Sequence, residues 1–152
     1  LNGKNIGSAV TGSNGAATIT LTAKTLKTAK AGKKNLVIKF ESVNYYVVSK
    51  TVKITVNKEK TKITAKNKKF KKSKKIKKYA ILLKNSKGKA ISKQKVTLKV
   101  NGKNYIAKTN AKGKAIFKIK KLNKKGKFSA KITFKGNSYY NKAVKKIKLN
   151  IK

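Results

Sequence analysis

The side chains that could do chemistry in this sequence are few in kind, because lysine supplies nearly all of them. The chain has 44 basic residues, all of them lysine, against two acidic residues, and it contains no histidine or cysteine. General acid–base catalysis needs a positioned titratable group, most often histidine or a pair of carboxylates. The only such pair available is Glu41 and Glu59, and we expect these carboxylates not to converge. The sequence therefore predicts a protein that is not an enzyme.

The same composition offers few ligands to a metal ion or a cofactor. The absence of cysteine removes thiolate sites and any disulfide framework. Oxygen cages for Ca²⁺ are built largely from carboxylates, and two glutamates are too few. A nucleophilic lysine needs a buried ammonium with a depressed pKa, whereas most lysines here fall on outward strand positions. We predict no catalytic residue, no metal site and no cofactor.

The lysines could instead act together as a polyelectrolyte surface. A formal net charge of +42 on 152 residues attracts polyanions and repels itself. Without arginine, the chain lacks the planar fork that reads guanine, so sequence-specific binding of nucleic acid is disfavoured. Compositional drift explains the excess equally well, because lysine, asparagine and isoleucine are abundant together. The lysines predicted to contact a polyanion are Lys68, Lys69, Lys71, Lys72, Lys74, Lys75, Lys77, Lys78, Lys124 and Lys125.

An aromatic pair, Tyr139–Tyr140, is the remaining candidate for binding chemistry. In the structural interpretation, which we favour, one ring packs into the core and caps the end of a β-sandwich. In the functional interpretation the pair is a stacking platform for a sugar or a base.

Short β-strands are the elements that would position these side chains. Phe128, Ala130, Ile132 and Phe134 alternate with polar residues, which is the pattern of a half-buried strand. The same alternation predicts further strands at 61–65, 79–83, 96–100, 105–107, 115–119 and 147–151, and no segment has a helical period. Asn101–Gly102 is typical of a type I′ hairpin turn. These features predict an all-β, antiparallel two-sheet sandwich, in which the lysine-rich stretch 66–78 is a solvated, mobile connection.

The chain also repeats itself with a period of about 95 residues. Gly32–Tyr46 matches Gly126–Tyr140, and the Asn2–Gly3 turn matches Asn101–Gly102. The stretch 60–99 has no counterpart before Leu1. We therefore expect residues 1–57 to be the C-terminal part of a repeat whose front strands are missing, with an open sheet edge or poor order, and residues 58–152 to be a complete domain.

The second copy, including the run from Leu83 to Ile119, resembles the Ig-like repeats of large archaeal and bacterial cell-surface adhesin-like proteins. The match is carried by Val100-Asn101-Gly102-Lys103, by Gly113-Lys114-Ala115-Ile116-Phe117, and by Phe134-Lys135-Gly136-Asn137-Ser138-Tyr139-Tyr140. The sequence departs from the repeats at Ala90, where proline is usual, at the usual acidic positions, and at Phe128, where tyrosine is common. The resemblance implies an Ig-like β-sandwich with a structural or adhesive role at the cell surface.

Taken together, these features predict an extracellular adhesive repeat that contacts anionic wall polymers, glycans or acidic protein surfaces by nonspecific electrostatics. The alternative is a basic protein that binds nucleic acid without sequence preference. No run of apolar residues approaches the roughly 18 needed to span a bilayer, so no membrane span is expected in this segment.

Overall fold

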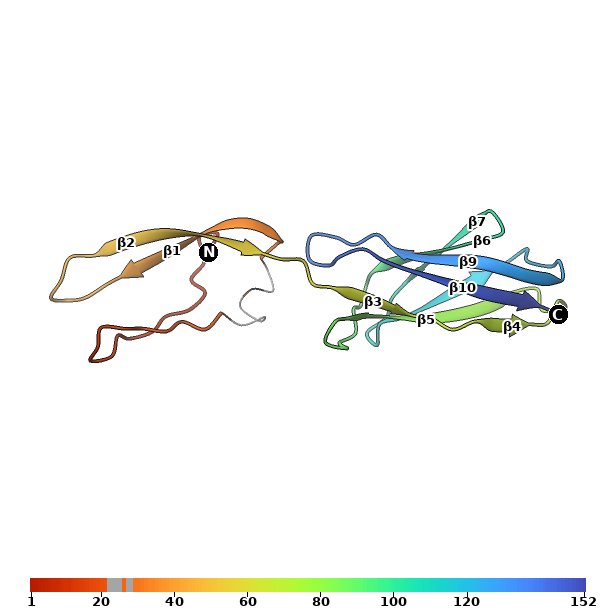
Figure 1. The fold of residues 1–152 in the computed structure, drawn as a ribbon, viewed down its shortest axis with the longest axis horizontal. Coiled ribbons are helices and arrows are strands. Elements are labelled where there is room, and N and C mark those ends of the chain that lie inside the picture. The colour runs from red at the N-terminus through yellow and green to blue at the C-terminus, as the bar shows by residue number, and fades with distance from the viewer. Residues whose placement is uncertain (22–25, 27–28) are drawn as a thin grey trace. The chain divides into compact units, whose positions relative to one another are not determined.

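The computed structural model describes residues 1–21, 26 and 29–152, which form two compact units, Leu1–Lys58 (unit 1) and Glu59–Lys152 (unit 2). Residues 22–25 and 27–28, which belong to the predicted first copy, lie outside the described residues. Unit 1 contains strands β1 (Gly32–Phe40) and β2 (Val48–Val56). Unit 2 contains β3 (Thr61–Thr64), β4 (Lys68–Phe70), β5 (Lys77–Asn85), β6 (Lys95–Val100), β7 (Lys103–Lys108), β8 (Lys114–Ile119), β9 (Gly126–Phe134) and β10 (Ala143–Ile151) (Figure 1).

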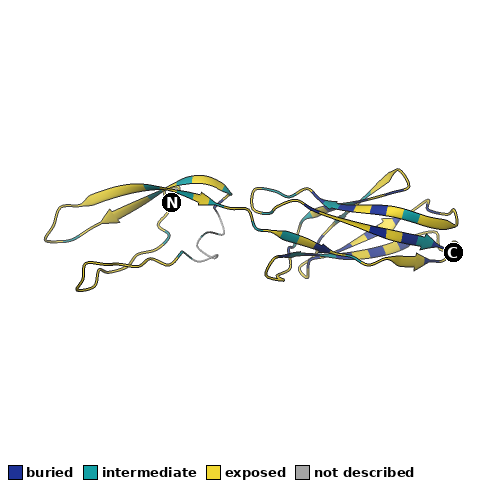
Figure 2. Ribbon diagram, viewed as in Figure 1, coloured by how far each residue is buried: buried dark blue, intermediate teal, exposed yellow. Residues whose placement is uncertain are grey.

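Unit 2 is a β-sandwich of two sheets. One sheet has the strand order β4-β10-β9-β6-β7 and the other β3-β5-β8. Every pairing is antiparallel except that of β4 with β10, which is parallel. The all-β, antiparallel prediction is therefore confirmed apart from this one pair. Along β5, β6, β8 and most of β9, buried residues alternate with more exposed ones (Figure 2).

The alternating apolar residues of both sheets form a single core in unit 2. Burial of this apolar surface is the main favourable contribution to folding. Tyr105, Phe128 and Tyr140 are half-buried and pack against the core. Its largest fully buried side chains are Tyr79, Lys77, Phe117, Leu83, Leu98, Ile119, Leu122, Ile132, Leu149, Ile151, Val96 and Val100.

The sequence predicts that the stretch 66–78 is a solvated, mobile connection, but the structure contains strand residues there. Residues Lys68–Phe70 form β4, and Lys77 begins β5. Phe70 is buried and lies opposite Ile151, while Lys68 and Lys69 stay exposed. A three-residue strand on the edge of a sheet can thus bury one aromatic ring and still leave its charges in water.

The turn that follows β6 has the predicted geometry. Asn101 and Gly102 have φ angles of 47° and 70°, and Val100 pairs with Lys103 across a two-residue loop. Both positions of a type I′ turn require positive φ, which asparagine and glycine tolerate best. The type I′ prediction is confirmed.

Unit 1 is built around one antiparallel hairpin. Nine residues of β1 pair with nine of β2, from Gly32 opposite Val56 to Phe40 opposite Val48. In the part of the chain that the structure describes, these strands pair only with each other. Ala29 is the one hydrophobic residue of unit 1 that is buried among those described. The described residues of the two units contain no helix with the length and hydropathy needed to cross a bilayer.

Candidate polyanion-binding face

Three lysines in register cross the outer face of the five-stranded sheet. Lys99 on β6 lies opposite Lys131 on β9, and Lys131 lies opposite Lys146 on β10. All three are exposed, because the residues that alternate with them, such as Leu98 and Ile132, face the core. We call Lys99, Lys131 and Lys146 the lysine ladder.

The ladder concentrates positive charge without a compensating acid. Side chains directly opposite each other in an antiparallel pair have Cβ atoms about 4.5–5.5 Å apart, and like charges there are destabilising. Two unit charges 5 Å apart repel by about 0.8 kcal/mol at the dielectric constant of water, and lysine side chains that splay apart lower this repulsion. No aspartate or glutamate belongs to β6, β9 or β10. An anion bound across the ladder would relieve this repulsion.

Opposed lysines also occur in pairs elsewhere in unit 2. Lys62 lies opposite Lys84 and Lys78 lies opposite Lys118 in the three-stranded sheet, and Lys95 lies opposite Lys108 in the five-stranded sheet. The ladder differs from these pairs because it continues over three neighbouring strands and lies beside a depression in the surface.

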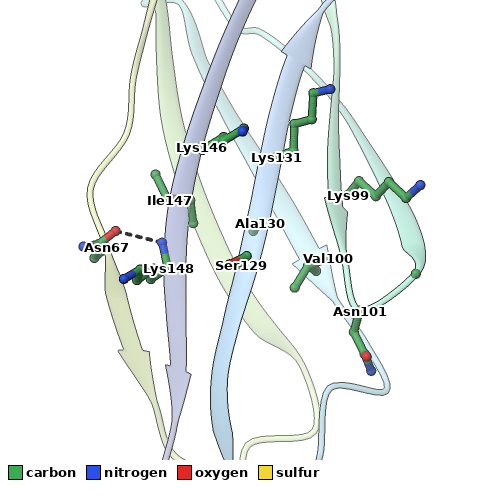
Figure 3. Close-up of a pocket in the computed structure, with 11 residues that line it drawn as sticks. Asn67, Lys99, Val100, Asn101, Ser129, Ala130, Lys131, Lys146, Ile147 and Lys148 are labelled. Atoms are coloured by element: carbon green, nitrogen blue, oxygen red, sulfur yellow. Dashed lines mark hydrogen bonds between the residues drawn. The ribbon is translucent and has the colours of Figure 1, made fainter.

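That depression has a volume of about 640 Å³ and lies on the outer face of β6, β9 and β10 (Figure 3). Lys148 reaches it from the position opposite Ser129. The Oδ1 atom of Asn67 accepts a hydrogen bond of 2.8 Å from the backbone N–H of Lys148. This bond holds the connection between β3 and β4 against β10. Ammonium groups and one hydroxyl are donors, so this face suits anionic groups. The lining residues are Asn67, Lys99, Val100, Asn101, Gly102, Ser129, Ala130, Lys131, Lys146, Ile147 and Lys148.

Of the ten lysines predicted to contact a polyanion, Lys77 requires correction. It is fully buried, and its Nζ donates a hydrogen bond of 2.7 Å to the carbonyl oxygen of Lys74. Its position on β5 has the same parity as Tyr79, and it lies opposite Ile119, so its side chain enters the core. A buried ammonium cannot contact a polymer on the surface, and the prediction for Lys77 is wrong.

The other nine predicted lysines are exposed, and most of them lie at one end of unit 2. Lys71, Lys72, Lys74 and Lys75 connect β4 to β5, and Lys124 and Lys125 precede β9. Both connections lie near the end of β10: the N–H of Lys72 donates to the carbonyl of Lys152, and Gly126 lies opposite Ile151. Lys68 has its Nζ 5.2 Å from the centroid of the Phe70 ring. Whether these residues bind a polyanion stays a prediction.

The ladder itself was not predicted from the sequence. Outward strand positions are visible as alternation, but the pairing of β6 with β9 joins residues that are far apart in the chain. The only signal was an outward lysine in two predicted strands, Lys99 and Lys131, and Lys146 immediately before the strand predicted at 147–151.

The carboxylate of Glu59 has a structural partner. Its Oε1 accepts a hydrogen bond of 2.7 Å from Nδ2 of the buried Asn85, whose own Oδ1 accepts one from the N–H of Lys89. Burial, and secondarily the charge of Glu59, raise the pKa of Tyr140. In the described part of the chain, no three His, Cys, Asp or Glu residues gather where they could hold a metal ion.

The tyrosine pair divides between core and surface. Tyr140 packs against the core, whereas Tyr139 is 38% exposed. The Oδ1 atom of Asn137 accepts hydrogen bonds from the backbone N–H groups of both tyrosines, which fixes the loop before β10. The structural interpretation of the pair is therefore confirmed for Tyr140.

Comparison with known proteins gives no family assignment: no family model and no curated protein matches the chain. Solved structures that are similar to it include two of bacterial adhesins. The first is of a 1.5-MDa bacterial ice-binding adhesin, with 13% identity over 90% of this chain and 50% of that chain, and a TM-score of 0.37. The second is of a Ca²⁺-stabilized adhesin with which an Antarctic bacterium binds ice, with 15% identity over 91% and 36%, and a TM-score of 0.37. This chain spans half or less of each, and similarity at this level assigns no function.

Proposed function

We propose that the chain is part of a structural and adhesive repeat protein of the cell surface, without catalytic activity, in which unit 2 is an Ig-like domain. What supports the fold assignment is how the strands are divided. Strands β3, β5 and β8 occupy one sheet, and β6, β9 and β10 the other, as strands A, B, E and C, F, G do in Ig domains. Because this architecture hosts many functions, the functional proposal depends on surface chemistry.

The single observation that supports the functional proposal is the lysine ladder. Its three ammonium groups follow one another across the sheet, so they suit a partner whose negative charges repeat along a chain. Anionic wall polymers and acidic glycans have this character. Such binding is electrostatic, releases counterions and weakens steeply with salt.

The test is retention on an immobilised sulfated polysaccharide, eluted with increasing salt. We expect the protein to be retained at low salt and released well below 1 M, where the screening length is about 3 Å. The double variant Lys131→Val, Lys146→Thr places on unit 2 the residues that unit 1 has at the corresponding positions, Val37 and Thr51. It should elute at lower salt, and its plot of log K against log salt should have a slope smaller by about two.

The matched control is the variant Lys62→Thr, Lys118→Val, which loses the same charge from the three-stranded sheet and also breaks opposed lysine pairs. If it lost as much retention as the ladder variant, charge spread over the whole surface would account for binding, and the ladder would not be the site. If the affinity did not fall with increasing salt concentration, the electrostatic mechanism would be excluded. Tighter binding to single-stranded DNA than to the polysaccharide at equal salt would favour the nucleic-acid alternative.

A further inference from the structure

Unit 1 reproduces the turns of the later part of unit 2. Asn2 and Gly3 have φ angles of 52° and 73°, close to the 47° and 70° of Asn101 and Gly102. The same residue pair thus makes the same left-handed turn in both units, about one repeat apart.

A second turn is also repeated. Gly15 and Gly113 have φ angles of 74° and 70°, and each donates its N–H to the carbonyl oxygen three residues earlier, that of Gly12 or Asn110, at 2.9 Å. In both units this turn comes between the Asn-Gly turn and the long hairpin. In unit 2 it immediately precedes β8.

The strands of the two hairpins correspond residue by residue. Strands β1 and β9 each have nine residues, as do β2 and β10, and the pairing begins at Gly32 opposite Val56 and at Gly126 opposite Ile151. The two hairpins also share one polar residue on the apolar face. An exposed lysine lies opposite an isoleucine on the same face, as Lys50 opposite Ile38 and as Lys145 opposite Ile132.

The corresponding faces differ in what covers them. Phe134, Ile132 and Ala143 are 2%, 0% and 8% exposed in unit 2. Their counterparts in unit 1, which are Phe40, Ile38 and Val48, are 42%, 45% and 61% exposed. At the Phe40–Val48 end of its hairpin, unit 1 therefore presents to solvent the apolar face that unit 2 uses as half of its core, whereas Leu36, Val52 and Ile54 nearer the other end are half-buried.

Unit 2 shows what kind of segment covers this face. The sheet β3-β5-β8 packs over the inner face of β9 and β10, while β6 pairs with β9 and β4 pairs with β10 at the hairpin's edges. All of these strands except β8 lie between residues 61 and 100. The sequence from 60 to 99 is also the part of the repeat that has no counterpart within unit 1.

We propose that the apolar face and both edges of the β1–β2 hairpin are a docking site for a strand segment of the same repeat type, with the pattern of residues 59–99. The segment would add a strand to each edge and lay a second sheet over Phe40, Ile38 and Val48. Its recognition chemistry is β-augmentation at the edges combined with burial of alternate apolar side chains, such as those of Ile81 and Leu98 in unit 2. This inference does not depend on the lysine ladder.

The test is a chain in which an added copy of residues 59–99 is joined directly before Leu1. Leu1 corresponds to Val100, so the junction keeps the Asn-Gly turn in register. Hydrogen exchange at the β1 and β2 amides that lack a strand partner should slow by about a hundredfold or more, because these groups become paired and covered. The control carries Ile81→Lys and Leu98→Lys in the added copy only, which keeps the length and removes the apolar pattern.

Three outcomes would overturn the proposal. Unchanged exchange in the fused chain would show that the segment does not dock. Equal slowing in the control would show that the apolar pattern does not determine docking. A dimer of the unfused chain in sedimentation, with the β1 and β2 amides already protected, would make a second copy the occupant of the face.

Discussion

The hairpins β1–β2 and β9–β10 have one pattern and two environments. They share strand length, register and the position of an exposed lysine on the apolar face. Yet Tyr46 is 95% exposed, while its counterpart Tyr140 packs against a core. An alternating pattern is therefore enough to make a strand and set its register, but burial requires a second sheet.

The outer faces of the two hairpins, unlike their apolar faces, carry different residues. Their backbones correspond, but where unit 2 has Lys131 opposite Lys146, unit 1 has Val37 opposite Thr51. The lysine ladder is consequently a feature of unit 2 and not of the repeat. This difference makes unit 1 the natural source of the substitutions that test the ladder.

The largest difference between the units should appear when the shared phenylalanine is truncated. We expect Phe134→Ala to lower the free energy of unfolding of unit 2 by about 3–5 kcal/mol, because it leaves a cavity in a packed core. Phe40→Ala should cost less than about 1 kcal/mol in unit 1, because that ring is 42% exposed. Denaturant unfolding and hydrogen exchange measure the two losses. Equal losses would mean that the face of unit 1 is covered in solution.

A smaller difference is expected at the repeated glycine turn. A Cβ atom on Gly113 would lie 2.5 Å from the carbonyl oxygen of Leu83, whereas one on Gly15 would meet nothing within 4 Å. Both residues have positive φ, which costs a non-glycine residue roughly 1–2 kcal/mol. Gly113→Ala should therefore lower the denaturation midpoint of unit 2, by more than Gly102→Ala, whose Cβ would also lie in open space. Similar losses for these two variants would contradict the steric argument.

The smallest effect concerns the titration of Tyr140. Burial, followed by the charge of Glu59, raises the pKa of its phenol, so the neutral form is favoured in the folded state. The resulting stability is fully present below the ordinary tyrosine pKa of about 10 and is lost as the pH rises through the folded value. Glu59→Gln should lower the pKa of Tyr140 while keeping an acceptor for Asn85.

The measurement is the phenolate absorbance of the protein during alkaline titration, from which the titration of a Tyr140→Phe variant is subtracted. Under the same subtraction, the Glu59→Gln protein should titrate at lower pH than the parent. An unchanged curve would show that Glu59 does not act on Tyr140 and that burial alone raises the pKa.

Prediction from sequence succeeded where structure is local. Alternation located the strands around Ile81, Leu98 and Ile132, and the Asn101–Gly102 turn has the expected geometry. It failed at β4, because three residues that include two lysines carry too little periodicity. It failed also at Lys77, whose burial follows from its parity on β5 and not from its residue type.

The sequence by itself determined which chemistry is available, which strongly alternating segments are strands and where the Asn101–Gly102 turn lies, because these depend on residue types and on neighbours a few positions away. Only the tertiary structure decided which apolar faces are covered and which lysines stand side by side. Those properties depend on strand pairing between distant segments, such as β6 with β9. For this reason two hairpins with the same strand lengths and register contribute to a packed core in unit 2 and to an exposed apolar surface around Phe40 in unit 1.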